Sequence, residues 1–368
     1  MKVTKIKTFL VNPRVDRTKN WLFVKVETDE GIYGWGECYT QPNREMATEL
    51  YVKKLGDYFI GHNPFNIKHF IYVSYQDFAS LRGSLDFYSA VSGIEQAFWD
   101  ILGKTLRVPI YNLLGGTFRD KIRIYAKLAK WQTNKELLEE VNLVISQGFT
   151  AFKFDPFPGP KRQYISRDEE NIAIERVKIV RKTVGDKIDL LIEGHRRLTP
   201  NIAIRVAKQF EKYNPFWYEE PVSASNLDLL KEVSRNTTIP IVTGEVFYSK
   251  NEFKEVFEKK CAQIINPDIG SCGGIMSLKE ISSMAEPYSV AIAPHNYNST
   301  TIALASTLHV CANVPNFIIT EYFPYFKKVS DEISINPIVV KNGFIEIPNE
   351  PGLGIELDEN KLLHYLNK

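Results

Sequence analysis

The 368-residue sequence predicts an α/β protein, a modified (β/α)8 barrel of the TIM type with an N-terminal α+β capping domain. Two observations predict this fold. After residue 120, eight short apolar runs alternate with amphipathic helical stretches, which is typical of a parallel sheet closed into a barrel. The first 120 residues instead combine three strand-like runs with a long helical region, so they predict a separate α+β unit.

The N-terminal region predicts a small antiparallel sheet followed by helices. The runs 3–11, 21–28 and 32–39 have the composition of strands, and a turn at 29–31 separates the last two. From 44 to 103 the period becomes helical, and residues 89–103 predict a buried helix. We assign residues 1–120 to the capping domain, completed by about 325–368.

The barrel is predicted over residues 121–324, where strand and helix patterns alternate. The expected strands are 122–126, 150–154, 188–193, 215–219, 240–245, 263–268, 289–295 and 317–321. The expected helices between them are 134–147, 166–184, 201–213, 226–236, 250–260 and 276–287. The last segment does not continue the repeat, and we expect 333–340 and 343–347 to be strands that return to the N-terminal domain.

Composition and charge exclude several classes of protein. The net charge of +2 is too balanced for a nucleic-acid-binding or membrane-surface protein. No run of eighteen apolar residues predicts a transmembrane helix. The four cysteines form no C-x-x-C pair, and the N-terminus lacks the apolar core of a signal peptide, so we expect a reduced, cytoplasmic protein.

Three glutamates recur at the ends of predicted strands. Glu193, Glu219 and Glu245 are separated by 26 residues each, the length of one β/α unit. The carboxyl ends of barrel strands converge on one face, where three carboxylates would repel one another unless a cation lies between them. Because oxygen ligands favour a hard ion, these residues predict a Mg²⁺ site.

Other titratable residues end neighbouring strands. Asp268 and His295 end the next two predicted strands, and a carboxylate on one ring nitrogen would make His295 a candidate general base. His195, two residues after Glu193, is a candidate general acid. Lys153, at the end of the second strand, is either a substrate-neutralising cation or base, or a strand-end salt bridge.

Together these motifs resemble the enolase superfamily, and within it the mandelate racemase subgroup. The resemblance covers nearly the whole chain and rests on SGIEQAFWDILGK (92–104), FWYEEPV (216–222), TGEV (243–246), NPDIGSCGGI (266–275) and PHN (294–296). It implies Mg²⁺ on the three glutamates and the Asp268–His295 dyad as base. It also implies that Glu321 donates a hydrogen bond to the substrate carboxylate or acts on it electrostatically.

Two departures from the subgroup pattern bear on the activity. The strand that holds Lys153 usually carries a second lysine two residues later, where this chain has Asp155, so the usual second base of a racemase is missing. The first metal ligand is usually Asp, and here it is Glu193. The motifs around these positions resemble archaeal aldonate dehydratases, in which a histidine at the place of His195 assists departure of the 3-hydroxyl.

The resemblance implies a Mg²⁺-dependent dehydratase that converts a sugar acid into a 2-keto-3-deoxy acid, with D-arabinonate favoured and D-gluconate or D-galactonate next. A racemase or epimerase of a 2-hydroxy acid and a non-catalytic sugar-acid binder stay open as alternatives. Arg17, Trp21 and Tyr39 of the cap are candidate substrate contacts, as are Lys153 and Glu321. A symmetric homo-oligomer, often an octamer, is also implied.

Overall fold

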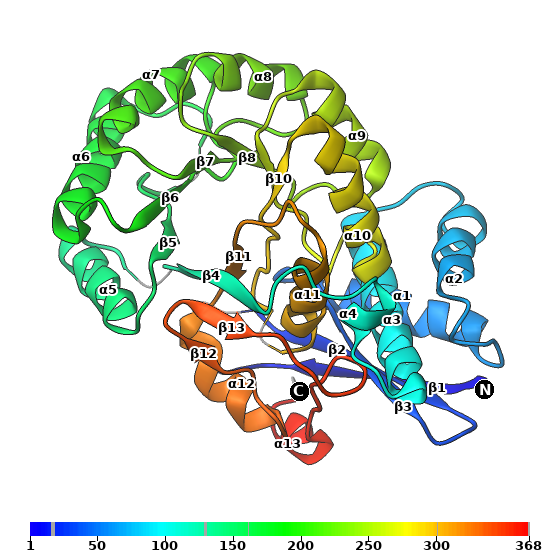
Figure 1. Ribbon diagram of the computed structural model, residues 1–368. Helices are drawn as coiled ribbons and strands as arrows, with labels where there is room; N and C mark the ends of the chain where they lie inside the picture. Colours follow the sequence, from blue (N-terminus) through cyan, green and yellow to red (C-terminus); the bar gives the residue numbers. More distant parts are fainter. Residues whose placement is uncertain (16–18, 129–130, 161, 300, 367–368) are drawn as a thin grey trace.

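The cap is built on a three-stranded antiparallel sheet. The computed structural model describes residues 1–15, 19–128, 131–160, 162–299 and 301–366, and Figure 1 shows the cap beside the barrel. The sheet has the order β1-β2-β3, with bounds β1 Val3–Val11, β2 Trp21–Thr28 and β3 Tyr33–Cys38. These three predicted strands are confirmed.

Helices cover the cap sheet, and two glycines allow the longest of them to lie close to it. The helices are α1 Glu45–Phe59, α2 Ile67–Val73, a π-helical turn η1 Ser74–Phe78, α3 Leu85–Leu106 and α4 Ile110–Leu113. A Cβ on Gly36 would lie 1.7 Å from the Gly93 carbonyl oxygen of α3, and a Cβ on Gly34 would lie 2.1 Å from that of Ala97. Only glycine permits this backbone approach, so the α3–β3 contact is specified by the sequence.

Eight parallel strands form the barrel, and each overlaps a predicted strand. Their bounds are β4 Lys121–Lys127, β5 Ala151–Phe154, β6 Asp189–Glu193, β7 Trp217–Glu219, β8 Ile241–Thr243, β9 Ile264–Ile265, β10 Ala291–Ile292 and β11 Thr320–Tyr322. β11 pairs with β4, and a parallel bridge from Ile292 to Phe317 joins β10 to the chain leading into β11. The sheet is therefore closed, and the barrel with its capping domain is confirmed.

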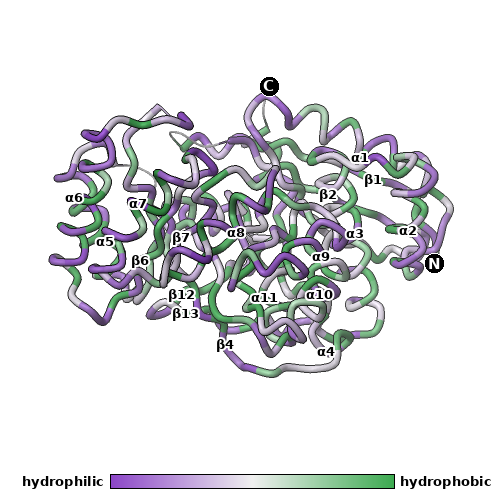
Figure 2. Tube along the Cα trace, turned by 90° about the horizontal axis from the view of Figure 1, so that it is seen from above, coloured by the Kyte–Doolittle hydropathy of each residue, from purple (hydrophilic) through white to green (hydrophobic). Residues whose placement is uncertain are grey.

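Helices between the strands cover the outside of the barrel. They are α5 Asn134–Ser146, α6 Arg167–Val184, α7 Pro200–Phe210, the 3-10 turn η2 Glu211–Tyr213, α8 Leu227–Arg235, α9 Lys250–Lys259, α10 Gly274–Ala285, the 3-10 turn η3 Glu286–Tyr288, and α11 Ile302–Asn313. Helix α11 was not predicted from the sequence. Nearly all of its residues are buried, between barrel and cap, so it lacks the polar face that produces a helical period. In Figure 2 the tube of α11 is mostly in the hydrophobic colour, whereas the tubes of α5 and α6 alternate between the hydrophobic and the hydrophilic colour.

The C-terminal segment corrects one prediction. It forms η4 Pro324–Phe326, α12 Lys327–Ile333, β12 Val340–Lys341, β13 Phe344–Glu346 and α13 Glu359–His364. The strand expected at 333–340 is wrong, because α12 ends at Ile333 and the short strand β12 begins at Val340.

The second expected strand exists, but its partner differs from the prediction. β13 pairs antiparallel with the barrel strand β4, with Phe344 opposite Arg123, and not with the cap sheet. Other parts of the C-terminal segment contact the cap: the ring of Phe326 packs edge-on against Trp21, and the Tyr365 carbonyl accepts the backbone N–H of Asn12 at 2.8 Å. The boundary proposed at residues 120 and 121 falls between α4 and β4.

Candidate active site at the carboxyl ends of the barrel strands

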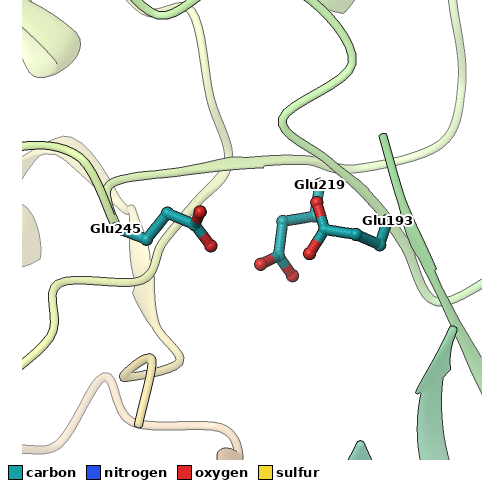
Figure 3. Close-up of side chains that lie close together, drawn as sticks. All are labelled: Glu193, Glu219 and Glu245. Atoms are coloured by element: carbon teal, nitrogen blue, oxygen red, sulfur yellow. The ribbon is translucent and has the colours of Figure 1, made fainter. Parts of the chain in front are cut away.

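The three glutamates that recur every 26 residues converge in the structure. Glu193 and Glu219 are the last residues of β6 and β7 and lie opposite each other in the parallel register, and Glu245 follows β8. One carboxylate oxygen from each lies within 4.8 Å of the other two. Figure 3 shows the three carboxylates directed toward a common space.

The donor set fits a divalent cation. Glu219 is buried, and its Oε2 has no hydrogen-bond partner among the described residues. Burial, together with the neighbouring charge of Glu193, raises the pKa of Glu219 well above its usual range. A cation between these oxygens would occupy the unpartnered atom and offset the repulsion, and an all-oxygen set is the kind that Mg²⁺ prefers.

Lys153 lies at the centre of the acidic group. Its Nζ is 2.6 Å from Glu219 Oε1, 3.0 Å from Glu321 Oε1 and 3.4 Å from Glu193 Oε2. Burial alone would lower the pKa of Lys153, but the surrounding carboxylates, Glu219 first, raise it well above the usual value. The side chain therefore stays charged, which favours an electrostatic role over that of a base.

Asp268 and His295 form a buried pair at adjacent strand ends. His295 Nδ1 is 2.8 Å from Asp268 Oδ2, and that oxygen also accepts the Tyr297 backbone N–H at 3.1 Å. Since a carboxylate accepts hydrogen bonds, Nδ1 carries the hydrogen and Nε2 faces the other carboxylates, 3.2 Å from Glu245 Oε2.

The charge around His295 strengthens it as a base. Burial works to lower the pKa of His295, but Glu321, Glu245 and Asp268 outweigh it and raise that pKa above its usual value. The positive imidazolium that forms when His295 accepts a proton is therefore stabilised by its surroundings. The positive charge of His295 acts in turn on Glu245. Burial works to raise the pKa of Glu245, but His295 and Arg196 hold that pKa at about 2.

His195 belongs to a second histidine–carboxylate pair, which sequence analysis missed. Its Nδ1 is 2.6 Å from Asp155 Oδ2, and its backbone N–H donates to Glu193 Oε1 at 2.9 Å. Arg197 donates to the same Asp155 oxygen. His195 and Asp155 line a cavity of about 680 Å³ that also borders Lys127 and Tyr297.

These observations are matched by family comparisons. The family model described as "Mandelate racemase / muconate lactonizing enzyme, N-terminal domain" matches residues 5–115, and "Enolase C-terminal domain-like" matches residues 136–361. The chain belongs to the enolase superfamily, in its mandelate racemase subgroup.

Relatives from this superfamily cover the whole chain. A D-galactonate dehydratase of Klebsiella pneumoniae (strain 342) is 35% identical over 376 aligned positions, which are 99% of this chain and 94% of the relative. The D-galactonate dehydratase of Cronobacter sakazakii is 33% identical, with the same two coverages. The crystal structure of the 3,6-anhydro-D-galactonate cycloisomerase from Zobellia galactanivorans superposes with a TM-score of 0.90 at 32% identity and covers 100% of both chains.

The three cap residues predicted to touch substrate have different positions. Tyr39 reaches the barrel, since its backbone N–H donates to the Gly270 carbonyl and its ring lies 6.4 Å from the His295 ring. Trp21 is buried at the start of β2 and packs edge-on against Phe326, with ring centroids 5.3 Å apart. Arg17 lies outside the described residues. Their contact with substrate stays a prediction.

Two further basic residues at the site were not singled out from the sequence. Lys19 of the cap is buried, with its Nζ 3.5 Å from the centroid of the Tyr297 ring, and burial lowers its pKa well below the usual value. Arg196 pairs with Glu245. The HRR run at 195–197 was a visible signal for Arg196, but the position of Lys19 depends on how the cap docks on the barrel.

None of the helices in the described ranges is long and apolar enough to cross a membrane.

Proposed function

We propose that this protein is a hydro-lyase that removes water from an aldonate to give a 2-keto-3-deoxy sugar acid. The observation that carries the proposal is the convergence of a carboxylate-rich cation site, a charged lysine and two histidine–carboxylate pairs on one barrel face. The dehydratase relatives, 33% and 35% identical over 99% of this chain, support the same reaction.

Among aldonates, we propose D-galactonate as the first substrate to test. The two curated relatives are D-galactonate dehydratases, and the Zobellia cycloisomerase also acts on a galactonate derivative. D-Arabinonate, which the sequence resemblance favoured, has no support from these relatives. A homo-oligomeric assembly and a cytoplasmic location remain predictions from the sequence.

Glu193, Glu219 and Glu245 would hold Mg²⁺. The ion would supply positive charge that binds the substrate carboxylate and stabilises the negative charge that develops when the C2 proton leaves. Lys153, held among Glu219, Glu321 and Glu193, adds a fixed positive charge at the same place. Electrostatic stabilisation is required because a proton next to a carboxylate is very weakly acidic.

The two histidines take the two proton transfers. His295 Nε2 accepts the C2 proton, and the electron pair of that C–H bond is first held on C2 and the carboxylate oxygens. This pair then forms the C2–C3 double bond as the C3–O bond breaks with its own electron pair, and His195 donates a proton to the departing hydroxyl, which leaves as water. The enol that remains tautomerises to the 2-keto-3-deoxy acid.

The test is a screen of C5 and C6 aldonates with purified protein, with and without Mg²⁺, that measures 2-keto-3-deoxy acid. We expect product from D-galactonate, and loss of at least about 100-fold in rate after removal of the metal. Proton exchange at C2 in D₂O without loss of water would show a racemase or epimerase instead. Tight aldonate binding in Mg²⁺ without turnover or exchange would show a binding protein.

A further inference from the structure

We infer that Asp155 is a positioning residue for the departure of the 3-hydroxyl, because it holds the ring of His195 by Nδ1 and leaves Nε2 free to face the cavity that both residues line. This inference rests on the proposed dehydratase function. The position of Asp155 is the one at which the sequence departs from the two-lysine pattern of the subgroup.

The contacts of Asp155 leave its carboxylate one orientation. Oδ1 accepts the backbone N–H of Phe157 at 3.0 Å, and Oδ2 accepts from His195 Nδ1 at 2.6 Å. Arg197 also donates to Oδ2. With both oxygens engaged, Asp155 is a fixed acceptor for the imidazole.

Arg197 is itself held in place, which makes the arrangement rigid. Its Nε donates to the Gly194 carbonyl at 3.1 Å and its Nη1 to the Pro158 carbonyl at 3.2 Å. The side chain is only 2% exposed. Arg197 therefore ties the loop after β6, which carries His195, to the loop after β5, which carries Asp155.

His195 needs such a support because it lies on a strained turn and its ring is only partly buried. It has a φ of +52° and Arg196 a φ of +60°, in the left-handed region that non-glycine residues rarely adopt. Its side chain is 21% exposed and borders the 680 Å³ cavity, so packing alone does not define the ring orientation. The Asp155 contact at Nδ1 leaves Nε2 as the ring nitrogen available to the substrate.

The test compares two leaving groups in the same enzyme. The wild type, Asp155→Ala and Asp155→Asn are assayed with the best aldonate from the screen and with its 3-deoxy-3-fluoro analogue. In the analogue, His295 takes the C2 proton, the C3–F bond breaks, and fluoride leaves without needing a proton. Water loss is read from the keto acid, and fluoride release with an electrode.

We expect D155A to lower kcat for water loss by about 10- to 100-fold, with KM changed less than about threefold. Fluoride release should fall by less than about fivefold, and D155N should lie between wild type and D155A. Since Asp155 acts through His195, the double variant D155A/H195N should be no slower in water loss than H195N alone.

Three results would overturn the inference. The first is an equal fall in the rates of water and fluoride elimination in D155A. The second is a change in KM with kcat unchanged, and the third is additive effects of the two substitutions on water loss in D155A/H195N. D155N keeps the side-chain shape, so it tests the inference even where D155A does not fold. Asp189→Asn is the matched control, because Asp189 also pairs with an arginine, Arg123 at 2.7 Å, at the opposite end of β6. A wild type that eliminates neither group from any aldonate would instead contradict the proposed function.

Discussion

The two histidine–aspartate pairs differ in their surroundings although they consist of the same residue types. Asp268 and His295 come from adjacent strand ends and are almost wholly buried, at 3% and 6% exposed. Asp155 and His195 come from two loops, are 18% and 21% exposed, and border an open cavity.

The charges around each pair differ as well. His295 Nε2 faces Glu245 at 3.2 Å and Glu321 at 3.4 Å, so an added proton is stabilised by nearby carboxylates. His195 shares its aspartate with a buried guanidinium, that of Arg197. If His295 is the base and His195 the acid, as proposed, the difference teaches that environment, rather than residue type, separates the two roles.

The largest effect is expected for His295→Asn. Removal of the base should lower dehydration by at least about 10³-fold and abolish C2 exchange in D₂O, because both need the C2 proton to be taken. Mg²⁺ affinity, measured by calorimetry, should stay within about threefold. His62→Asn, an exposed histidine, is the control and should keep wild-type rates. Substantial turnover by H295N would disprove the assignment of the base.

A smaller and qualitatively different effect is expected for His195→Asn. Water loss should fall by about 10²- to 10³-fold, because the hydroxyl then leaves without a proton donor. C2 exchange with solvent should continue, since His295 is intact, and it is measured by NMR of the recovered substrate. Loss of exchange together with dehydration would show that the two histidines do not have separate roles.

A third buried histidine, His309, has no carboxylate partner among the described residues, and its burial predicts an effect on stability. His309 Nε2 bonds to the Leu353 carbonyl at 3.1 Å, and burial lowers the pKa of His309 to about 4. In the unfolded chain His309 has an ordinary pKa of about 6.5. Between about pH 6.5 and pH 4 the unfolded chain therefore binds a proton that the folded chain does not. This contribution to the free energy of unfolding is fully present above pH 6.5 and is lost as the pH falls toward 4, by about 3 kcal/mol.

Urea unfolding of His309→Gln and wild type between pH 7 and pH 4 measures this contribution. Over that range the free energy of unfolding of the variant should fall by about 3 kcal/mol less than that of wild type. His62→Gln, at an exposed position, should follow the wild-type curve. Parallel curves for H309Q and wild type would contradict the prediction.

The barrel and the acidic centre were predictable because they arise from local repetition. One β/α unit spans about 26 residues here, so glutamates at that spacing occupy equivalent strand ends and meet at one face. The buried helix α3 was predictable for a similar reason, since its apolar run is long. Helix α11 was missed because it is apolar on every side, and the partner of β13 was wrong because a short strand does not specify its neighbour.

The sequence by itself determined the order of the eight barrel strands. It also determined the three glutamates, the Asp268–His295 pair and Lys153 as residues of one barrel face. Tertiary structure alone decided the Asp155–His195 contact, since the two residues are 40 positions apart and follow different strands. It also decided that Lys153 is paired with three carboxylates and that Lys19 of the cap lies over Tyr297. The physical reason is that strand spacing fixes which backbone ends converge. Which loop side chains then meet depends on side-chain direction and cap docking, which no repeat encodes.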